Sequence, residues 1–162
     1  MKIIDSDNDL WQATPVYAAP TPAPNRLLSW EEWQAVRPTW PAAMPVGVVL
    51  DNTLDPQVLA DDLRATPCRL ALLVLQFPKW TDGRAYSQAR LLRARLRFDG
   101  EIRARGEVLA DMMPMLERCG FDAVQLRADQ KPEVARRALG FFAGHYQGDL
   151  VQPQPLFARH AA

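Results

Sequence analysis

The segment from Arg69 to Phe77, RLALLVLQF, constrains the fold more than any other part of the chain because it is almost continuously apolar. A strand with one face in water alternates apolar and polar residues, whereas a strand buried on both faces reads as one apolar run. Strands of the second kind are typical of parallel sheets. We therefore predict that this segment is a strand inside such a sheet.

The segments on either side of this strand alternate between strand and helix patterns. Further strands are expected at PVGVVL (residues 45–50), GEIRARG (residues 100–106) and the stretch from Phe121 to Leu126. A helix signal follows each of the four strands. The first helix is expected to begin at Asp55-Pro56 and the third at the cap Asp111. The second, after Asp82, has the apolar stripe Ala85, Ala89, Leu92 and Leu96, and the fourth, after Lys131-Pro132, has a face of Val134, Ala138, Phe141 and His145. Four strand–helix units predict an α/β fold with a largely parallel sheet of about four strands and flanking helices on its faces.

The first 44 residues have a different character and are expected to form an appendage. Lys2-Ile3-Ile4 and the stretch from Trp11 to Tyr17 flank the turn-rich SDND, which suggests a small hairpin. AAPTPAPN (residues 18–25) is typical of an extended proline-rich connector, and SWEE then begins a short helix with a capping box. The predicted organisation is therefore an N-terminal region over 1–44, an α/β domain over 45–148 and a loose tail over 149–162.

Composition excludes several classes of partner. Lysine plus arginine equals aspartate plus glutamate at 19 each, which disfavours a nucleic-acid binder. The N-terminus reaches an acidic residue by Asp5, so it is not a signal peptide, and the apolar run Leu70–Leu75 is too short to span a membrane. We expect a soluble cytoplasmic protein that binds neither nucleic acid nor membrane.

Candidate site residues follow from the predicted sheet, because open parallel sheets bind ligands beyond the carboxyl ends of their strands. Five residues in these segments are candidates for binding an anion or a partner: Lys79, Trp80, Arg84, Arg105 and Arg127. Asp51 and Glu107 follow two of the strands and form a possible acid–base pair. A concave pocket that gathers these groups would indicate an enzyme, whereas a flat apolar surface would indicate a protein partner.

Each of these candidates also has a purely structural interpretation. Asp82 is expected to cap the following helix, where it would occupy the backbone donors that an anion needs. Trp80 either covers a pocket, anchors a partner or packs over the sheet edge, and the sequence does not separate these roles. Arg90, Arg93 and Arg97 share a helix face that is more typical of solvated or ion-paired side chains than of a binding patch.

Known cofactor and metal motifs are missing from the sequence, so the cofactor stays unknown. The eight glycines form neither a phosphate loop nor a dinucleotide fingerprint. Cys68 and Cys119 are too few for a zinc or iron–sulfur site, and they are most simply two buried thiols. His145 is expected late in the last helix and His160 in the loose tail, so no metal site is predicted from these two histidines.

Two long segments carry a resemblance to a known family. FPKWTDGRAYSQARLLR (residues 77–93) and GEIRARGEVLADMMPMLERCGFDAV (residues 100–124) are similar to the bacterial family catalogued as domain of unknown function number 934. The resemblance covers about residues 46–148, and a weaker similarity is present in MKIID and at Trp11. Its members are described as oxidoreductase-related proteins encoded beside the sulfite reductase haemoprotein. Trp80, Ala85 and Val124 depart from the family's usual phenylalanine, glycine and aromatic residue, which favours a packing role for an aromatic at position 80.

The resemblance implies a context rather than a set of catalytic residues. That context is assimilatory sulfate and sulfite reduction in the cytoplasm, near an enzyme that makes sulfide from sulfite. The first hypothesis is therefore an accessory protein that binds or assists the sulfite reductase haemoprotein. The alternative is a small enzyme that acts on an anionic metabolite of sulfur at the carboxyl edge of the sheet.

Overall fold

The computed structural model describes residues 1–13, 20–65, 69–142 and 144–159, and within them the chain forms one parallel sheet of seven strands in the order β1-β7-β6-β5-β4-β3-β2. The strands are β1 (Lys2–Ile3), β2 (Gln12–Ala13), β3 (Arg26–Ser29), β4 (Val46–Leu50), β5 (Leu70–Phe77), β6 (Glu101–Gly106) and β7 (Ala123–Val124). Every pairing is parallel. The predicted α/β class is confirmed, and the sheet has more strands than the four expected.

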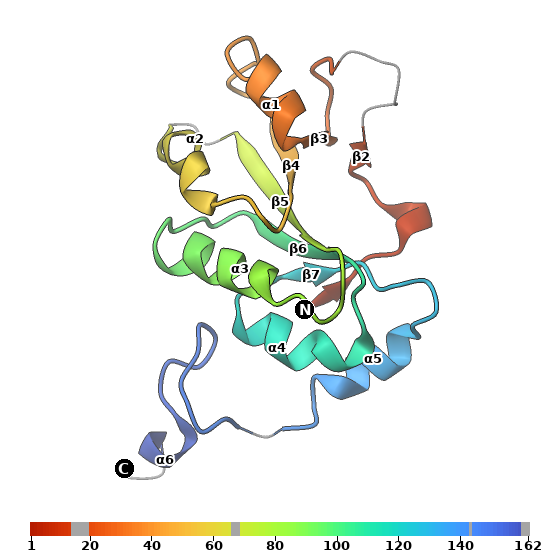
Figure 1. Cartoon of the computed structure of the whole chain (residues 1–162), viewed down its shortest axis with the longest axis vertical. Helices are drawn as coiled ribbons and strands as arrows, with labels where there is room; N and C mark the ends of the chain where they lie inside the picture. The colour runs from red at the N-terminus through yellow and green to blue at the C-terminus, as the bar shows by residue number, and fades with distance from the viewer. Residues whose placement is uncertain (14–19, 66–68, 143, 160–162) are drawn as a thin grey trace.

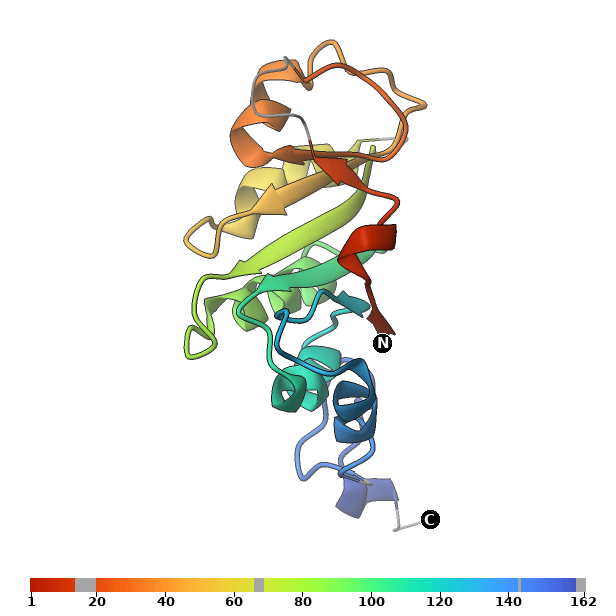
Figure 2. The same cartoon turned by 90° about the vertical axis from the view of Figure 1, so that its right-hand side faces the viewer.

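The helical elements lie mainly on one face of this sheet (Figures 1 and 2). They are η1 (Ser6–Asn8), α1 (Trp30–Val36), η2 (Pro56–Leu59), α2 (Ala60–Arg64), α3 (Arg84–Ala94), η3 (Ala110–Met112), α4 (Met113–Arg118), α5 (Pro132–Ala138) and α6 (Leu156–Arg159). The main core contains buried residues from α1, α3, α4 and α5 together with one face of strands β3 to β7. The predicted flanking helices are present, and they cover mainly this face.

Strand order explains why the helices gather on one side. From β2 to β7 each new strand is added next to the previous one, always in the same direction across the sheet. Right-handed crossovers between strands added in one direction place their helices on the same face. A sheet wound in this way has no point in its middle where the strand order reverses, which is where open α/β sheets usually form their ligand crevice.

Residues 4–11, which we call the strap, cross the face that the helices leave uncovered (Figure 2). They connect β1 at one edge of the sheet to β2 at the other. Arg103 of β6 binds the strap through Asp9, with 2.6 Å between Nη1 and Oδ2. Trp11 packs against a second, smaller core cluster of Leu27, Leu72 and Val74. β5 is therefore buried on both faces as predicted, but on this face without a helix.

The strap replaces the hairpin that was expected at the N-terminus. Lys2 pairs with Ala123 of β7, and Gln12 pairs with Arg26 of β3, so the two segments lie at opposite edges of the sheet. Two-residue strands carry no periodicity that could specify their partners. Their positions are determined by contacts of the strap instead.

Local signals located the other elements well. The capping box is present, since the Ser29 Oγ accepts the Glu32 amide at 3.2 Å and the Glu32 carboxylate accepts the Ser29 amide at 2.7 Å. Asp55 caps η2, and Pro56 stands in its first turn. Asp111 is not the predicted cap, because it lies inside η3 and Leu109 precedes that element.

The C-terminal part of the chain is less helical than expected. α5 ends at Ala138, so Phe141 and His145 do not continue its apolar face. The segment beyond α5 extends away from the sheet (Figure 1) and is tethered to α4 by an ion pair between Arg118 and Asp149, with 2.9 Å between Nε and Oδ2.

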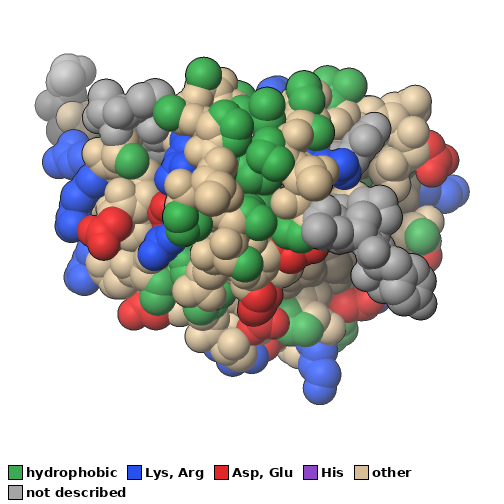
Figure 3. Space-filling view, turned by 90° about the horizontal axis from the view of Figure 1, so that it is seen from above, with side chains coloured by type: hydrophobic (Ala, Val, Ile, Leu, Met, Phe, Trp, Pro, Cys, Tyr) green, Lys and Arg blue, Asp and Glu red, His purple; other side chains and the backbone are tan. Residues whose placement is uncertain are grey.

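The opposite end of the molecule, around α1, is apolar at its centre. The loop after α1 exposes small apolar residues, namely Pro38, Pro41, Ala42, Ala43 and Pro45. Figure 3 shows hydrophobic side chains across the middle of this end, with charged side chains around them. The charged candidate residues lie elsewhere, at or just beyond the carboxyl ends of β4 to β7 and at the start of α3.

Candidate functional site

The carboxyl ends of β4, β5, β6 and β7 bring the candidate residues to one edge of the sheet. Leu50 is level with Leu75, Phe77 with Gly106, and Ala104 with Val124. The amide of Glu107 also donates to the carbonyl of Phe77 at 2.8 Å, which joins the loops after β5 and β6. The four loops are therefore neighbours, as the sequence predicted.

Arg84 is held by the chain's own carboxylate rather than left open for a ligand. Its Nε and Nη2 donate to the two oxygens of Asp82 at 3.0 and 2.6 Å. The Arg84 side chain and backbone hold the pKa of Asp82 well below its ordinary value, so this carboxylate stays charged. Asn52 donates to the same carboxylate at 2.7 Å. Arg84 is thus neutralised within the protein.

Asp82 also supports the start of α3, although it precedes the N-cap residue and is not the cap itself. Gly83 occupies the N-cap position and has no side chain to offer. The Asp82 carboxylate instead accepts the backbone amide of Arg84 at 3.2 Å. This contact places a negative charge at the helix start, where a bound anion would be repelled.

Asp51 is a poor candidate for a general base. Its Oδ1 accepts the amide of Thr53 at 2.8 Å and the hydroxyl of Thr53 at 2.5 Å. These hydrogen bonds lower the pKa of Asp51. A general base that works near neutral pH needs a pKa shifted in the opposite direction.

Arg127 forms a second ion-paired cluster with Glu107 and Asp129. Its Nη1 lies 2.7 Å from Glu107 Oε2, while Nε and Nη2 lie 2.6 and 2.7 Å from the two oxygens of Asp129. Hydrogen bonds from Arg127 lower the pKa of Asp129 to about 2, and both carboxylates raise the pKa of Arg127. Two negative charges therefore surround one positive charge, and Glu107 is already occupied.

Lys79, Trp80 and Arg105 differ from these clustered residues. Within the part of the chain that the structure describes, the Lys79 and Arg105 side chains have no hydrogen-bonding or ion-pairing partner. Trp80 is 57% exposed in the turn between β5 and α3, so it does not pack fully over the sheet edge. The backbone of the turn is closed by a hydrogen bond from Asp82 to Lys79 of 3.0 Å.

Four of the candidates line two grooves at the carboxyl edge: Asp51 lines one, and Arg105, Glu107 and Arg127 line the other. One, of about 580 Å³, is lined by Ser29, Trp30, Glu31, Val49, Asp51, Thr53, Leu54, Gln76 and Pro78. The other, of about 340 Å³, is lined by Ser6, Arg105, Gly106, Glu107, Gln125, Leu126, Arg127 and Ala128. Asp51 and Glu107 line different grooves, which argues against their acting as one acid–base pair. Lys79 lines neither of the two.

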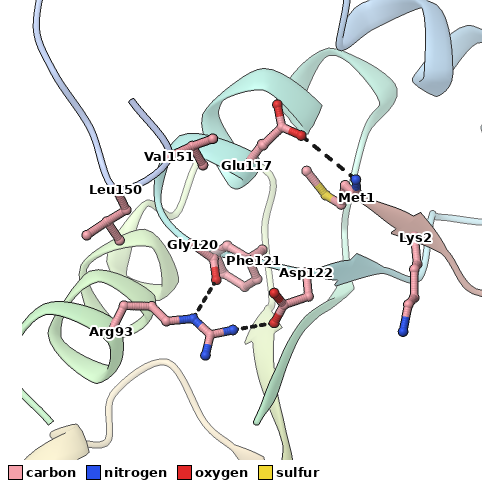
Figure 4. Close-up of a pocket in the computed structure, with 9 residues that line it drawn as sticks. All are labelled: Met1, Lys2, Arg93, Glu117, Gly120, Phe121, Asp122, Leu150 and Val151. Atoms are coloured by element: carbon pink, nitrogen blue, oxygen red, sulfur yellow. Dashed lines mark hydrogen bonds and ion pairs between the residues drawn. The ribbon is translucent and has the colours of Figure 1, made fainter. Parts of the chain in front are cut away.

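A groove of about 600 Å³ that the sequence did not indicate lies at the other ends of the strands, between β1, β7, α3 and α4 (Figure 4). Arg93 in this groove donates to the carbonyls of Gly120, Phe98 and Gly100 and to the carboxylate of Asp122. These bonds occupy the guanidinium in joining α3 to the loops before β6 and β7. Arg93 is therefore structural, whereas Arg90, Arg95 and Arg97 are exposed.

Metal and thiol chemistry find little support in the described residues. Among them no group of three His, Cys, Asp or Glu side chains could hold a metal ion. Cys119 is a partly buried free thiol, and burial raises its pKa, which disfavours the reactive thiolate. Cys68 lies outside the described residues. No described helix is long and apolar enough to cross a membrane.

Comparison with known proteins places the chain in a family without assigning it an activity. No curated protein matches the sequence significantly. One family model matches residues 47–157, which include all strands from β4 to β7 apart from Val46. The match contains both segments that carried the predicted resemblance, and that prediction is confirmed. Because the match spans well over half of the chain, the protein belongs to the family described as "Bacterial protein of unknown function (DUF934)".

Proposed function

We propose that the protein is a non-catalytic accessory protein of assimilatory sulfite reduction, and that it docks on the sulfite reductase haemoprotein through the turn that carries Trp80. The observation that carries the proposal is the 57% exposure of this tryptophan at a strand end. Exposed tryptophans on well-held backbone are typical anchors of protein interfaces.

The turn around Trp80 has the rigidity that an anchor needs. Asp82 connects it to Asn52 in the next loop and to Arg84 in α3. Lys79 stands beside the tryptophan without a partner among the described residues, and it offers a positive charge at the edge of the apolar contact. A preformed turn loses little conformational entropy on binding.

The pathway in this proposal rests on the family resemblance of residues 77–93 and 100–124. Residues Lys79, Trp80 and Arg84 all lie in the first of these segments. The docking surface and the resemblance to proteins encoded beside the haemoprotein therefore fall on the same part of the chain. The choice of the haemoprotein as partner rests on this resemblance alone.

The alternative of a small enzyme has weaker support. An acid–base mechanism at the carboxyl edge would use Asp51 and Glu107. The pKa of Asp51 is lowered by Thr53, and Glu107 is bound to Arg127. Enzymes activate such groups by shifting a carboxylate pKa upward or by leaving a base free to reach its substrate. We therefore favour the accessory role.

A binding measurement with two variants tests the proposal. Purified haemoprotein is titrated with the wild type and with Trp80→Ala, which should weaken the affinity about 30-fold if the tryptophan contributes about 2 kcal/mol as a hot spot. Trp80→Phe should retain most of the affinity because it keeps an aromatic anchor. Tyr146→Ala is the matched control, since Tyr146 is 81% exposed on the C-terminal segment.

Two results would overturn the proposal in different ways. Failure of the wild-type protein to bind the haemoprotein would exclude the haemoprotein as the partner. Equally tight binding of wild type and Trp80→Ala would support this partner but exclude the Trp80 turn as the docking surface. Thermal unfolding of each variant checks that a loss of affinity does not come from a loss of folding.

A further inference from the structure

The face of the sheet without helices contains a groove that the docking proposal does not use. It lies between the carboxyl ends of β6 and β7 and the strap, whose Ser6 forms part of its lining. A second groove of about 360 Å³ continues it, because Ser6, Leu126, Arg127 and Ala128 line both. Arg136 lines the second groove but not the first.

Arg105 supplies an uncompensated positive charge to this surface. Ala104 and Val124 belong to the main core on the helical side, so the residues that follow them, Arg105 in β6 and Gln125 directly after β7, face the opposite side. The Arg105 side chain is partly buried and has no carboxylate or carbonyl partner among the described residues. An arginine in this state offers five N–H donors in a planar arrangement.

Neighbouring side chains provide further donors that point to an oxyanion. Arg127 uses one N–H each from Nε, Nη1 and Nη2 for Asp129 and Glu107, which leaves two of its five donors. Gln125 Nε2 donates to Ser6 Oγ at 2.6 Å. Because this bond uses a lone pair of the hydroxyl oxygen, the proton of Ser6 is free to be donated to a ligand.

We propose that this groove binds the oxyanion head group of a small organic anion, with the head group at Arg105, Ser6 and Arg127. Charge-assisted hydrogen bonds from arginine to such groups are short, directional and frequently bidentate. Arg127 with Glu107 and Asp129 has one net negative charge, so Arg105 carries the attraction and Arg127 contributes only its two remaining donors.

The size of the groove indicates a ligand larger than a bare ion. A water molecule takes up roughly 30 Å³ in the liquid, and small-molecule pockets begin at roughly 300 Å³. The groove at Arg105 has a volume of about 340 Å³ and is continuous with the second groove. The organic part of the ligand extends along that second groove toward Arg136.

Titration of the isotopically labelled protein by NMR tests the site with defined probes. Inorganic phosphate, inorganic sulfate and acetate are added at constant ionic strength, with sodium chloride as the reference. The Nε–H signal of Arg105 and the side-chain amide of Gln125 should shift and saturate. Saturation by phosphate and sulfate alone assigns a tetrahedral head group, whereas saturation by acetate alone assigns a carboxylate.

Substitutions show whether the named residues are responsible. Arg105→Ala should weaken the probe's affinity at least tenfold, and Ser6→Ala should weaken it about threefold, as expected for one charge-assisted and one neutral hydrogen-bond donor. Arg95→Ala is the matched control, because Arg95 is an exposed arginine at the end of α3, and it should leave the affinity unchanged.

The proposal fails if the shifts grow linearly without saturation, or if Arg105→Ala binds the probes as tightly as the wild type. Equal shifts at Arg95 would likewise reduce the effect to general ionic screening. Arg105→Gln provides a second variant that keeps the side-chain stem and should also lose at least tenfold, so a folding defect in Arg105→Ala leaves the test intact. Binding of the haemoprotein is independent of all these outcomes.

Discussion

Arg103 carries a full positive charge in the interior of the protein, where it is 3% exposed. Two carboxylates compensate it: Asp9 of the strap lies 2.6 Å away, and Glu101 of the same strand lies 2.8 Å away. A buried charge is tolerated only when it is paired and hydrogen-bonded. The pairing with Asp9 thus connects the position of the strap to the stability of the sheet.

Replacing Asp9 by asparagine should lower the free energy of unfolding by about 2 kcal/mol, because a hydrogen bond to a charged group contributes roughly 1.5–3 kcal/mol. The substitution keeps the side-chain shape and removes the charge that Arg103 needs. Urea-induced unfolding measures the change. Asp7→Asn in the same strap is the control, since Asp7 is exposed and should change stability by less than about 0.5 kcal/mol. Equal losses for both variants would contradict the role of Asp9.

Tyr86 gives the protein a predictable response to alkaline pH. Burial, followed by the charges of Cys119 and Asp111, raises the pKa of Tyr86 to about 12. The folded state therefore binds the phenolic proton more tightly than the unfolded state, in which the pKa is about 10. The resulting stability is fully present below about pH 10 and is lost as the pH rises toward about 12.

The stability of wild type relative to Tyr86→Phe should accordingly stay constant from about pH 8 to pH 10 and fall above that range. Chemical unfolding at a series of pH values measures it. Parallel curves for wild type and Tyr86→Phe would show that burial does not raise this pKa.

At the scale of the element, the sequence predicted what local patterns determine. β5 and α3 were located because an apolar run and an apolar stripe need no knowledge of distant residues. The two-residue strands β1 and β2 were misassigned, since their pairing depends on contacts such as that between Asp9 and Arg103, which are 94 residues apart. α5 ended early at Ala138 although its apolar spacing continues.

The candidate site was likewise predictable only where local patterns determine it. The edge of the sheet and its loops were predictable from strand positions alone. The neutralisation of Arg127 by Glu107 was not, because that pair is 20 residues apart and joins two different loops. Arg105 and Arg127 look alike in the sequence, and only the packed structure distinguishes the free arginine from the paired one.

The capping box of α1 allows a direct test of one such local signal. Ser29→Ala removes the oxygen that accepts the Glu32 amide, and it should cost about 1 kcal/mol of stability, as N-cap losses usually do. Gln34→Ala on the exposed side of the same helix is the control and should cost less than about 0.5 kcal/mol. Urea-induced unfolding compares them. An unchanged midpoint for Ser29→Ala would mean that tertiary packing alone holds α1.

At the scale of the whole molecule, the winding of the sheet leaves one apolar face without helices, and the strap covers part of that face. Parallel sheets are normally covered on both faces, because their strands are apolar on both. Here the crossovers leave one face without helices, and Leu72 and Val74 on that face are nevertheless 0% and 1% exposed. Trp11 packs against this cluster, and the absence of a side chain at Gly47 leaves room for its ring.

A double-mutant cycle between Gly47 and Trp11 tests this account of the fold. A Cβ at position 47 would lie 3.0 Å from the Trp11 ring, 3.0 Å from Leu27 and 3.2 Å from Leu72. Gly47→Ala should therefore cost about 1–3 kcal/mol through overpacking. In a Trp11→Ala background the same change should cost less, because the new methyl group then occupies vacated space. The expected coupling is at least about 0.5 kcal/mol.

The control cycle pairs Gly47→Ala with Leu10→Ala, the residue before Trp11 in the strap. Leu10 is 75% exposed, so the two changes should add within about 0.5 kcal/mol. Urea-induced unfolding of all variants provides both cycles. Additivity in the Trp11 cycle as well would mean that the ring does not rest on Gly47. Coupling with Trp11 but not with Leu10 would show that the strap stabilises the protein by direct contact with the centre of the sheet. The strap would then take the place of a helical layer on this face.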